Sequence, residues 1–565
     1  MPGSLFRKKS IDKIVQESQE GASDSHGSRL NKVLTARDLT FMGIAAVVGA
    51  GIFSTIGKAA SDGGPGISLL FVITAVTCGF SALCYAEFAS RVPIAGSAYT
   101  YAYVSFGELI AWVIGWALIL EYAIGNIVVA ISWSSYFNHL LQAIGIHLPG
   151  WLSVDPSTAS TAYHATMDKI SHGVAATSDM KEIIAAWNSA PMIAGERIFV
   201  NLPAFIIVCL ISVLTYIGIR ESKKSANFMV MFKVAVIIFV IVLGVFYVDT
   251  DHWSPFMPNG FEGVLKGVSA VFYAYIGFDA ISTTAEECRN PQRDLPRGMI
   301  YSLVICTVLY ILIALVLTGM VPFSELNVND PLAFVFERVG QKWISYIVAI
   351  SAVVATTSVL LVFQLGQPRI WMSMSRDGLL PKAFGKVHPR FQTPYFSTIV
   401  TGLLVAIPSL FMQSSLMTDL TSIGTLFAFV LVSGGVLMLP RISSEGRKGF
   451  RLPYINGQWI VPLLYAIFLY IFKQRIVDTL KHPGNDHLQD ILFLVYVLLA
   501  FVLTVLTIIK KFSLIPILGV LFCAYLLIEI PAVSWRWFFV WMSIGLAIYF
   551  LYGYRRSRLA AAEEA

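Results

Sequence analysis

The 565 residues are 56% hydrophobic and only 13% charged, with a net charge of +6 and a mean hydropathy of +0.71. Soluble domains carry about a quarter charged residues, so this composition excludes an ordinary soluble protein. Apolar runs long enough to cross a hydrocarbon core of about 30 Å recur from Leu39 to Tyr554. The runs are continuous rather than alternating, which excludes an outer-membrane barrel and predicts an all-α polytopic membrane protein.

The 40 basic residues lie in short blocks between the apolar runs. Such blocks orient helices in a membrane and do not form a nucleic-acid surface, so no nucleic-acid partner is predicted. The six cysteines show no CxxC pair and no association with histidine, and the nine histidines do not cluster. The sequence therefore predicts no metal, no cofactor, no disulfide framework and no enzyme active site.

Residues 1–38 are polar and lack the apolar core of a signal peptide, so we expect an unfolded cytoplasmic tail. Beyond it we predict fourteen spans: 39–60, 66–90, 98–137, 197–219, 226–248, 262–287, 298–320, 342–372, 394–412, 416–440, 458–475, 489–509, 512–531 and 535–554.

With the N-terminus inside, most basic residues face the cytoplasm, and the even number of spans places the tail 555–565 there too. The third span is unusually long, but dividing it would destroy this asymmetry, so it is predicted as one tilted helix. Segment 138–196 is the longest outer loop, and no motif in it indicates a function.

The first span contains Gly49-Ala50-Gly51 near mid-membrane. Glycine weakens a helix by about 1 kcal/mol relative to alanine and permits close approach of another backbone or a ligand. Tight packing against a neighbouring helix explains the same residues equally well.

A second interruption favours a broken helix. The sixth span carries Gly277 next to Asp279, five spans after the first interruption. An odd repeat length inverts the second copy, which predicts two five-span inverted repeats, 39–248 and 262–440, followed by four accessory spans in 458–554. Free N–H groups at one break suit a carboxylate and free carbonyls at the other suit an ammonium, which together indicate an amino-acid site.

Six ordered blocks carry a resemblance: Gly49–Phe53, Tyr85–Ala89 with Arg91–Tyr99, Leu118–Tyr122, Gly277–Glu287 with Arg289–Gly298, Met374–Pro381 and Ile423–Phe429. In this order they resemble the amino acid–polyamine–organocation transporters, and specifically the cationic amino acid transporter family and its bacterial relatives. The resemblance covers most of the chain and implies a five-plus-five inverted-repeat core with extra C-terminal helices.

The resemblance also implies the substrate site. Its expected members are the backbone of the first break, the wall and gate of the second break, and a carbonyl of the third span: Gly49, Ala50, Gly51, Ile52, Tyr273, Ile276, Phe278 and Gly125. Glu121 is too deep to remain charged without a partner. It is either an orienting carboxylate beside the site or a structural hydrogen-bond acceptor.

Lys233 lies about 13 Å along its span from the inner end, at about 1.5 Å per residue. A lysine this deep either extends back to the interface or has a function, because its pKa is readily lowered by desolvation. In proton-coupled relatives the matching lysine resembles a built-in replacement for sodium. We therefore expect Lys233 to couple protons, in contact with the backbone near Gly43 and with hydroxyls at Thr356 and Thr357.

The expected function is proton-coupled import of L-amino acids, cationic or small and neutral, across a plasma membrane or bacterial inner membrane. Sodium coupling, exchange and a non-transporting amino-acid sensor on the same fold remain alternatives. A channel is not indicated, since the sequence contains no pore motif. The sequence does not identify a small membrane subunit as a partner, the oligomeric state or the amino acid carried.

Overall fold

The computed structural model describes residues 5–9, 34–92, 97–172, 177–193, 195–218, 223–328, 330–391, 393–439, 450–481 and 487–559. Residues 93–96 of the Arg91–Tyr99 block, most of the N-terminal tail and the last six residues lie outside this described part.

The elements of the first half are α2 (Ala36–Val47), the π-helix η1 (Gly51–Thr55), α3 (Ile56–Gly63), η2 (Gly64–Gly66), α4 (Ile67–Arg91), α5 (Ser97–Ser105), α6 (Glu108–Ala143), η3 (Gly150–Leu152), α7 (Pro156–Ser171), α8 (Ser178–Ser189), β1 (Met192–Ile193), β2 (Glu196–Arg197), α9 (Leu202–Ile217), α10 (Lys223–Gly244), η4 (Val245–Tyr247) and η5 (Thr250–Trp253).

The second half continues with α11 (Gly260–Lys266), α12 (Val268–Tyr273), η6 (Phe278–Glu287), α13 (Pro291–Met320), η7 (Phe323–Glu325), α14 (Pro331–Arg338), α15 (Lys342–Arg376), η8 (Lys382–Gly385), α16 (Tyr395–Ser409), α17 (Ser414–Met438), α18 (Ile460–Ile471), α19 (Lys473–Lys481), α20 (His487–Lys510), α21 (Leu514–Ile528), α22 (Ala532–Ile548), η9 (Tyr549–Gly553) and α23 (Tyr554–Arg556).

An all-α membrane architecture is confirmed, but the number of spans is not. Within the described residues, eight helices are long and apolar enough to cross a membrane, or up to ten if each of two bent helix pairs is one span. Three other predicted spans are the shorter apolar helices α9, α16 and α21, of 15 or 16 residues. At 1.5 Å per residue such helices cover only about 24 Å, less than the hydrocarbon thickness of about 30 Å.

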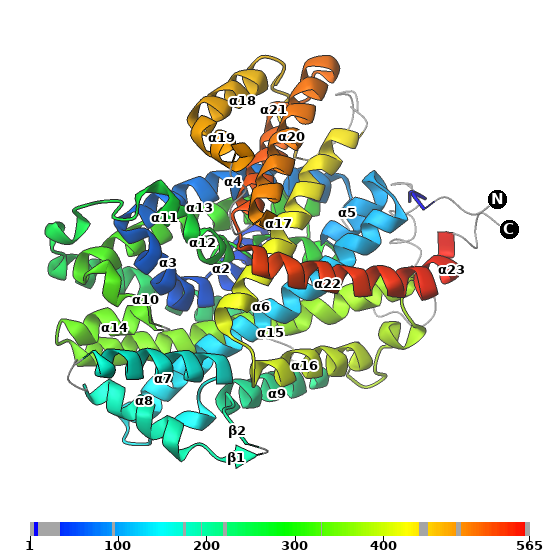
Figure 1. Cartoon of the computed structure of the whole chain (residues 1–565). Coiled ribbons are helices and arrows are strands. Elements are labelled where there is room, and N and C mark those ends of the chain that lie inside the picture. Colours follow the sequence, from blue (N-terminus) through cyan, green and yellow to red (C-terminus); the bar gives the residue numbers. More distant parts are fainter. Residues whose placement is uncertain are drawn as a thin grey trace.

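Two long helices, α6 and α15, lie side by side across the middle of the molecule (Figure 1). The most apolar window of α6 is completely buried inside the bundle. A helix that is apolar on every side is stable only when other helices surround it, and α15, α17 and α9 all pack on α6. The core is therefore built around the predicted third span.

The predicted third span, 98–137, differs at both ends. Its first part is the separate short helix α5, and the chain turns at Gly107, whose φ of 99° favours glycine, before α6 begins. The single long helix then runs on to Ala143, so the long connecting segment begins later than predicted. That segment contains α7, α8 and a β1–β2 hairpin, with the rings of Tyr163 and Trp187 stacked at 4.5 Å.

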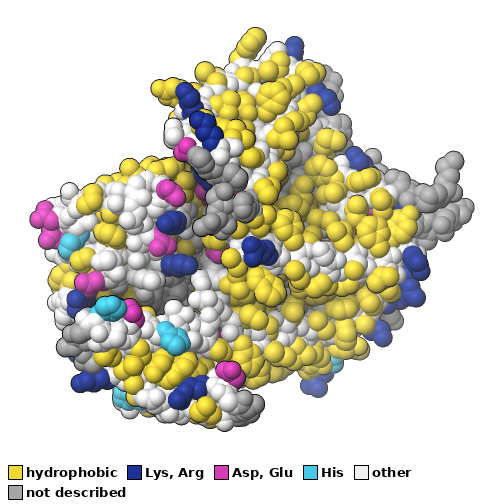
Figure 2. All heavy atoms as spheres, viewed as in Figure 1, with side chains coloured by type: hydrophobic (Ala, Val, Ile, Leu, Met, Phe, Trp, Pro, Cys, Tyr) yellow, Lys and Arg dark blue, Asp and Glu magenta, His cyan; other side chains and the backbone are white. Residues whose placement is uncertain are grey.

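The apolar surface fits a membrane setting. Figure 2 shows hydrophobic side chains spread over the C-terminal helices α18–α21 and along α22. In α22, Trp537, Phe539, Val540 and Ile544 are each about half exposed. An exposed apolar surface this extensive is typical of a protein that contacts lipid or another protein there.

The expectation of an unfolded N-terminal tail is wrong for residues 5–9. Their carbonyls accept hydrogen bonds at the start of α6, from Glu108 N to Arg7 O at 2.9 Å and from Leu109 N to Leu5 O at 3.1 Å. Lys9 forms an ion pair with Asp377, which follows α15. Residues 5–9 are held because they supply both backbone acceptors and a counter-charge.

The carboxylate of Glu108 joins the start of α6 to α5 and to the C-terminal segment. It accepts hydrogen bonds from Tyr103 at 2.9 Å and from Tyr549 at 3.0 Å, and Ser557 donates a third. Only 1% of Glu108 is exposed. Hydrogen bonds to a charged group are stronger than neutral ones, so this cluster is a stabilising contact between α6 and the C-terminal segment.

Replacing Glu108 with alanine removes the acceptor for all three hydroxyls, and each charged hydrogen bond contributes about 1.5–3 kcal/mol. We expect the E108A variant to melt at a clearly lower temperature in detergent. The exposed Glu182 in α8 provides a matched control, and E182A should melt like the wild type. Equal melting temperatures for both variants would show that the cluster contributes little.

Candidate substrate and coupling site

The interruption predicted in the first span is present. Helix α2 ends at Val47, and Val48 takes an extended conformation with φ −77° and ψ 94°. The Gly49 carbonyl then accepts hydrogen bonds from the N–H groups of Ile52 and Phe53, at 3.2 and 3.1 Å. Gly49–Gly51 therefore forms the first turn of a new helix. The N–H groups of this first turn have no carbonyl of a preceding turn to bind.

The second interruption lies where the sixth span was expected to break. Helix α12 ends at Tyr273, and the Tyr275 and Ile276 amides make tight bonds to the carbonyls of Phe272 and Tyr273, at 2.9 and 3.2 Å. Gly277 has a φ of 117°, a conformation that favours glycine, and η6 begins directly after it. The last carbonyls of α12 therefore accept i+3 bonds in place of the i+4 bonds of a continuing α-helix, which leaves a second lone pair on each oxygen.

The two interruptions touch each other. A Cβ atom on Gly51 would lie 2.3 Å from the Cα of Ala274, and one on Gly277 would lie 2.9 Å from the carbonyl carbon of Ala46. The Thr55 hydroxyl also contacts the Ala270 carbonyl across this interface at 3.1 Å. The two explanations that the sequence allowed, tight helix packing and an interrupted helix, therefore both hold here. Gly51 and Gly277 interrupt their helices and also let the two backbones pack closely.

Side chains from two neighbouring helices satisfy carbonyls at the end of α2. The Lys233 Nζ donates to the carbonyls of Ala45 and Val48, at 3.1 and 3.2 Å, and Lys233 is fully buried. The Tyr310 hydroxyl of α13 donates to the intervening Val47 carbonyl at 3.0 Å. Lys233 therefore points into the bundle and does not extend back to the interface.

The other predicted members of the coupling site lie on helices that pack nearby. Gly43 faces α13 and η6, since a Cβ there would meet Ser302 and Ile281 at 2.5 and 2.7 Å. Helix α15 packs against both α2 and α10. In α15 the Thr356 and Thr357 hydroxyls donate to carbonyls of the same helix at 2.7 Å, and Thr357 also accepts a bond from Trp133 at 2.9 Å.

The structure brings together two of the predicted pocket residues. The Tyr273 hydroxyl donates to the Gly125 carbonyl at 3.0 Å, joining the second break to α6. Glu121 lies one turn before Gly125 and is 3% exposed, and its Oε2 atom has no hydrogen-bond partner within the described part of the chain. A buried carboxylate oxygen in this condition is costly unless a proton or a ligand satisfies it.

The predicted gate residue is part of an aromatic cluster. Phe278 is fully buried, and its ring centroid lies 6.2 Å from that of Tyr85 and 5.2 Å from that of Phe429. Ile276 is 3% exposed. Both residues flank Gly277, so any change in the backbone at the second break would move them.

Sequence reasoning missed Tyr310 and Tyr136. Tyr136 of α6 donates to the Phe53 carbonyl in η1, and so holds η1 as Tyr310 holds the end of α2. Their signal in the sequence is weak, because a tyrosine within an apolar run is also compatible with ordinary packing. Among the described residues, no group of three or more His, Cys, Asp or Glu side chains could hold a metal.

Comparisons with known proteins identify the family of the chain. The family model described as amino acid permease matches residues 34–483, and a model for the C-terminus of these permeases matches residues 513–557. The chain is 37% identical to the branched-chain amino acid permease BcaP of Bacillus subtilis (99% of this chain, 100% of the relative). It is 35% identical to the methylthioribose transporter of the same organism (98% and 99%) and 36% identical to a vacuolar cationic amino acid transporter of Arabidopsis thaliana (78% and 68%).

A methyl group at Gly51 would force the two interruptions apart, because it would meet the backbone of Ala274. Overpacking costs about 1–3 kcal/mol, so we expect the G51A variant to lose roughly tenfold or more in substrate uptake. Gly79 in α4 is the matched control, since a Cβ there meets nothing within 4 Å. Wild-type uptake by G51A at an equal amount of folded protein would contradict this view of the contact.

Proposed function

Because the chain belongs to the amino acid permease family, we propose that it is a secondary active transporter that imports L-amino acids by alternating access, coupled to protons. It is a multi-pass membrane protein and not an enzyme, as its permease and transporter relatives also indicate. In this proposal α2–η1–α3 and α11–α12–η6 are the first members of two inverted repeats, 39–248 and 262–440.

The buried contact between Lys233 and the α2 carbonyls is the observation that carries the coupling proposal. An ammonium at this depth is strongly disfavoured unless polar groups surround it, so its protonation depends on the position of those carbonyls. Loss of the proton removes the charge from two bonds that hold the end of α2 against α10. Proton release would therefore loosen the first break, which is the part of the site proposed to bind substrate.

The two breaks supply complementary groups for the amino-acid backbone. In the proposal, the substrate carboxylate binds the N–H groups of Gly49, Ala50 and Gly51 in the first turn after Val48. The Ile52 N–H donates to the Gly49 carbonyl, so Ile52 contributes by closing that turn. The substrate ammonium binds carbonyls at the end of α12. Tyr273, held by Gly125, and Ile276 and Phe278 then surround the substrate side chain.

The cargo is proposed to be cationic or small and neutral. The unpartnered Oε2 of Glu121 favours a substrate with a second positive group, which it could reach directly or through water. Relatives are named for branched-chain amino acids, for cationic amino acids and for methylthioribose. A thermal-shift panel of the standard amino acids distinguishes these classes, because only a bound ligand stabilises the protein.

The proposed setting is a plasma membrane or bacterial inner membrane with both termini in the cytoplasm, as the distribution of basic residues predicts. The alternatives are sodium coupling, exchange, and a sensor that binds amino acids without moving them. A second cation beside Thr356 and Thr357 would be repelled by the charge of Lys233, which favours protons over sodium.

In proteoliposomes with an imposed proton gradient, we expect the wild type to accumulate its amino acid and Lys233→Ala to lose gradient-driven accumulation. The exposed Lys266 of α11 is the control for loss of a lysine, and Lys266→Ala should accumulate normally. Each variant is compared at equal amounts of folded protein.

Proton-dependent transport that survives in K233A would overturn the assigned role of Lys233. Accumulation driven by a sodium gradient alone would replace proton coupling with sodium coupling. Binding of amino acids without accumulation under either gradient would favour the sensor.

A further inference from the structure

A cavity of about 890 Å³ lies at the start of α13, away from the two helix breaks. Its described lining includes three guanidinium groups, those of Arg289, Arg293 and Arg297, and no carboxylate. Arg293 pairs with the neighbouring Asp294 at 3.0 Å, outside the lining, so the cavity itself retains a positive charge. The side chains of Glu286 and Glu287, just before this cluster, are outside the described part of the structure.

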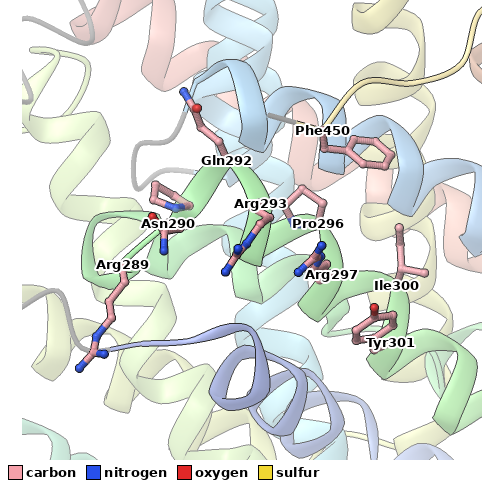
Figure 3. A pocket seen from close by; sticks show the side chains of 10 residues that line it. Arg289, Asn290, Gln292, Arg293, Pro296, Arg297, Ile300, Tyr301 and Phe450 are labelled. Atoms are coloured by element: carbon pink, nitrogen blue, oxygen red, sulfur yellow. The ribbon is translucent and has the colours of Figure 1, made fainter. Parts of the chain in front are cut away.

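The three arginines are spaced by four residues, and Tyr301 follows at the same spacing. Figure 3 shows Arg293 and Arg297 projecting from successive turns of α13, with Tyr301 on the next turn and Arg289 just before the helix. Residues spaced by three or four lie on one face of a helix. Arginine is well suited to phosphate because its planar group can donate two parallel hydrogen bonds.

The same face of α13 becomes apolar beyond the cavity. Tyr301, Val304 and Val308 are each slightly more than half exposed, and Ile305 and Leu312 are also exposed. Tyrosine is enriched where a bilayer meets water, so a bilayer with its headgroups at the level of Tyr301 would place its acyl chains against the residues after it. A soluble anion would use the arginines alone, whereas a lipid would use both parts of this surface.

We propose that this cavity binds the phosphate headgroup of an anionic phospholipid, whose acyl chains lie along the exposed stripe Tyr301–Leu312. Arg293 and Arg297 bind the phosphate, and Ile300 and Phe450 close the apolar side of the cavity where headgroup and chains meet. Basic pockets between membrane helices are suited to such headgroups. The site does not overlap the proposed substrate site and can be tested without transport.

Native mass spectrometry of the full chain in detergent measures retention of dioleoyl phosphatidylglycerol and, as the neutral lipid, dioleoyl phosphatidylcholine. We expect the wild type to retain phosphatidylglycerol preferentially. R293Q/R297Q should weaken that binding by roughly tenfold or more, because each arginine near the membrane surface attracts anionic lipid. R293K/R297K should bind between the wild type and R293Q/R297Q, since the charge is preserved but the paired hydrogen bonds of arginine are lost.

The control variant K382Q/K386Q removes two exposed charges elsewhere, on and next to η8, and should bind phosphatidylglycerol like the wild type. Undiminished binding in R293Q/R297Q, or an equal loss in the control, overturns the site. Displacement of the lipid by millimolar inorganic phosphate overturns the lipid assignment in favour of a soluble anion. If R293Q/R297Q does not fold, the single variants R293Q and R297Q provide the same test, each with a smaller expected loss.

Discussion

The structure depends on how backbone groups are satisfied where two helices are interrupted inside an apolar bundle. Water is scarce there, so each carbonyl left without a helical partner must find another donor or remain at a cost of several kcal/mol. At the end of α2 the donors are Lys233 and Tyr310, and in η1 a donor is Tyr136. Neighbouring helices therefore hold the first break in place with side-chain hydrogen bonds.

This constraint explains why the break is suited to a conformational role. A neutral tyrosine always offers one donor, but a lysine can exist with or without its charge, so only one of these supports can be altered by a proton. The two breaks also pack directly on each other at Gly51 and Gly277, which links any movement of α2 to Ile276 and Phe278 on either side of Gly277. Substrate binding and protonation can then act on the same piece of backbone.

Much of this arrangement was predictable from the sequence, for identifiable reasons. Length and hydropathy indicated the membrane helices, and glycines beside Asp279 and within Gly49–Gly51 located both interruptions. The resemblance to proton-coupled transporters predicted that Lys233 contacts the first span near Gly43, and its Nζ is bonded to the carbonyls of Ala45 and Val48. The roles of these residues in transport stay proposals.

The remainder depends on contacts between distant segments. Nothing in the sequence of residues 5–9 indicates that their carbonyls pair with the first amides of α6, and the tyrosines at 136 and 310 resemble ordinary core residues. The number of spans also could not be fixed, because α9, α16 and α21 are shorter than the apolar runs that contain them. The ends of helices are set by local turns and by packing. Hydropathy does not report either of these, so it does not predict where a helix ends.

The central claim is that protonation of Lys233 and occupancy of the first break are thermodynamically linked. The most direct test is the affinity of the purified protein for its amino acid as a function of pH, compared between the wild type and Lys233→Met, which keeps a long side chain without the charge. Linkage predicts that wild-type affinity changes with pH as one proton is exchanged per substrate, and that this dependence disappears in the variant. The same pH dependence in both proteins would contradict the account.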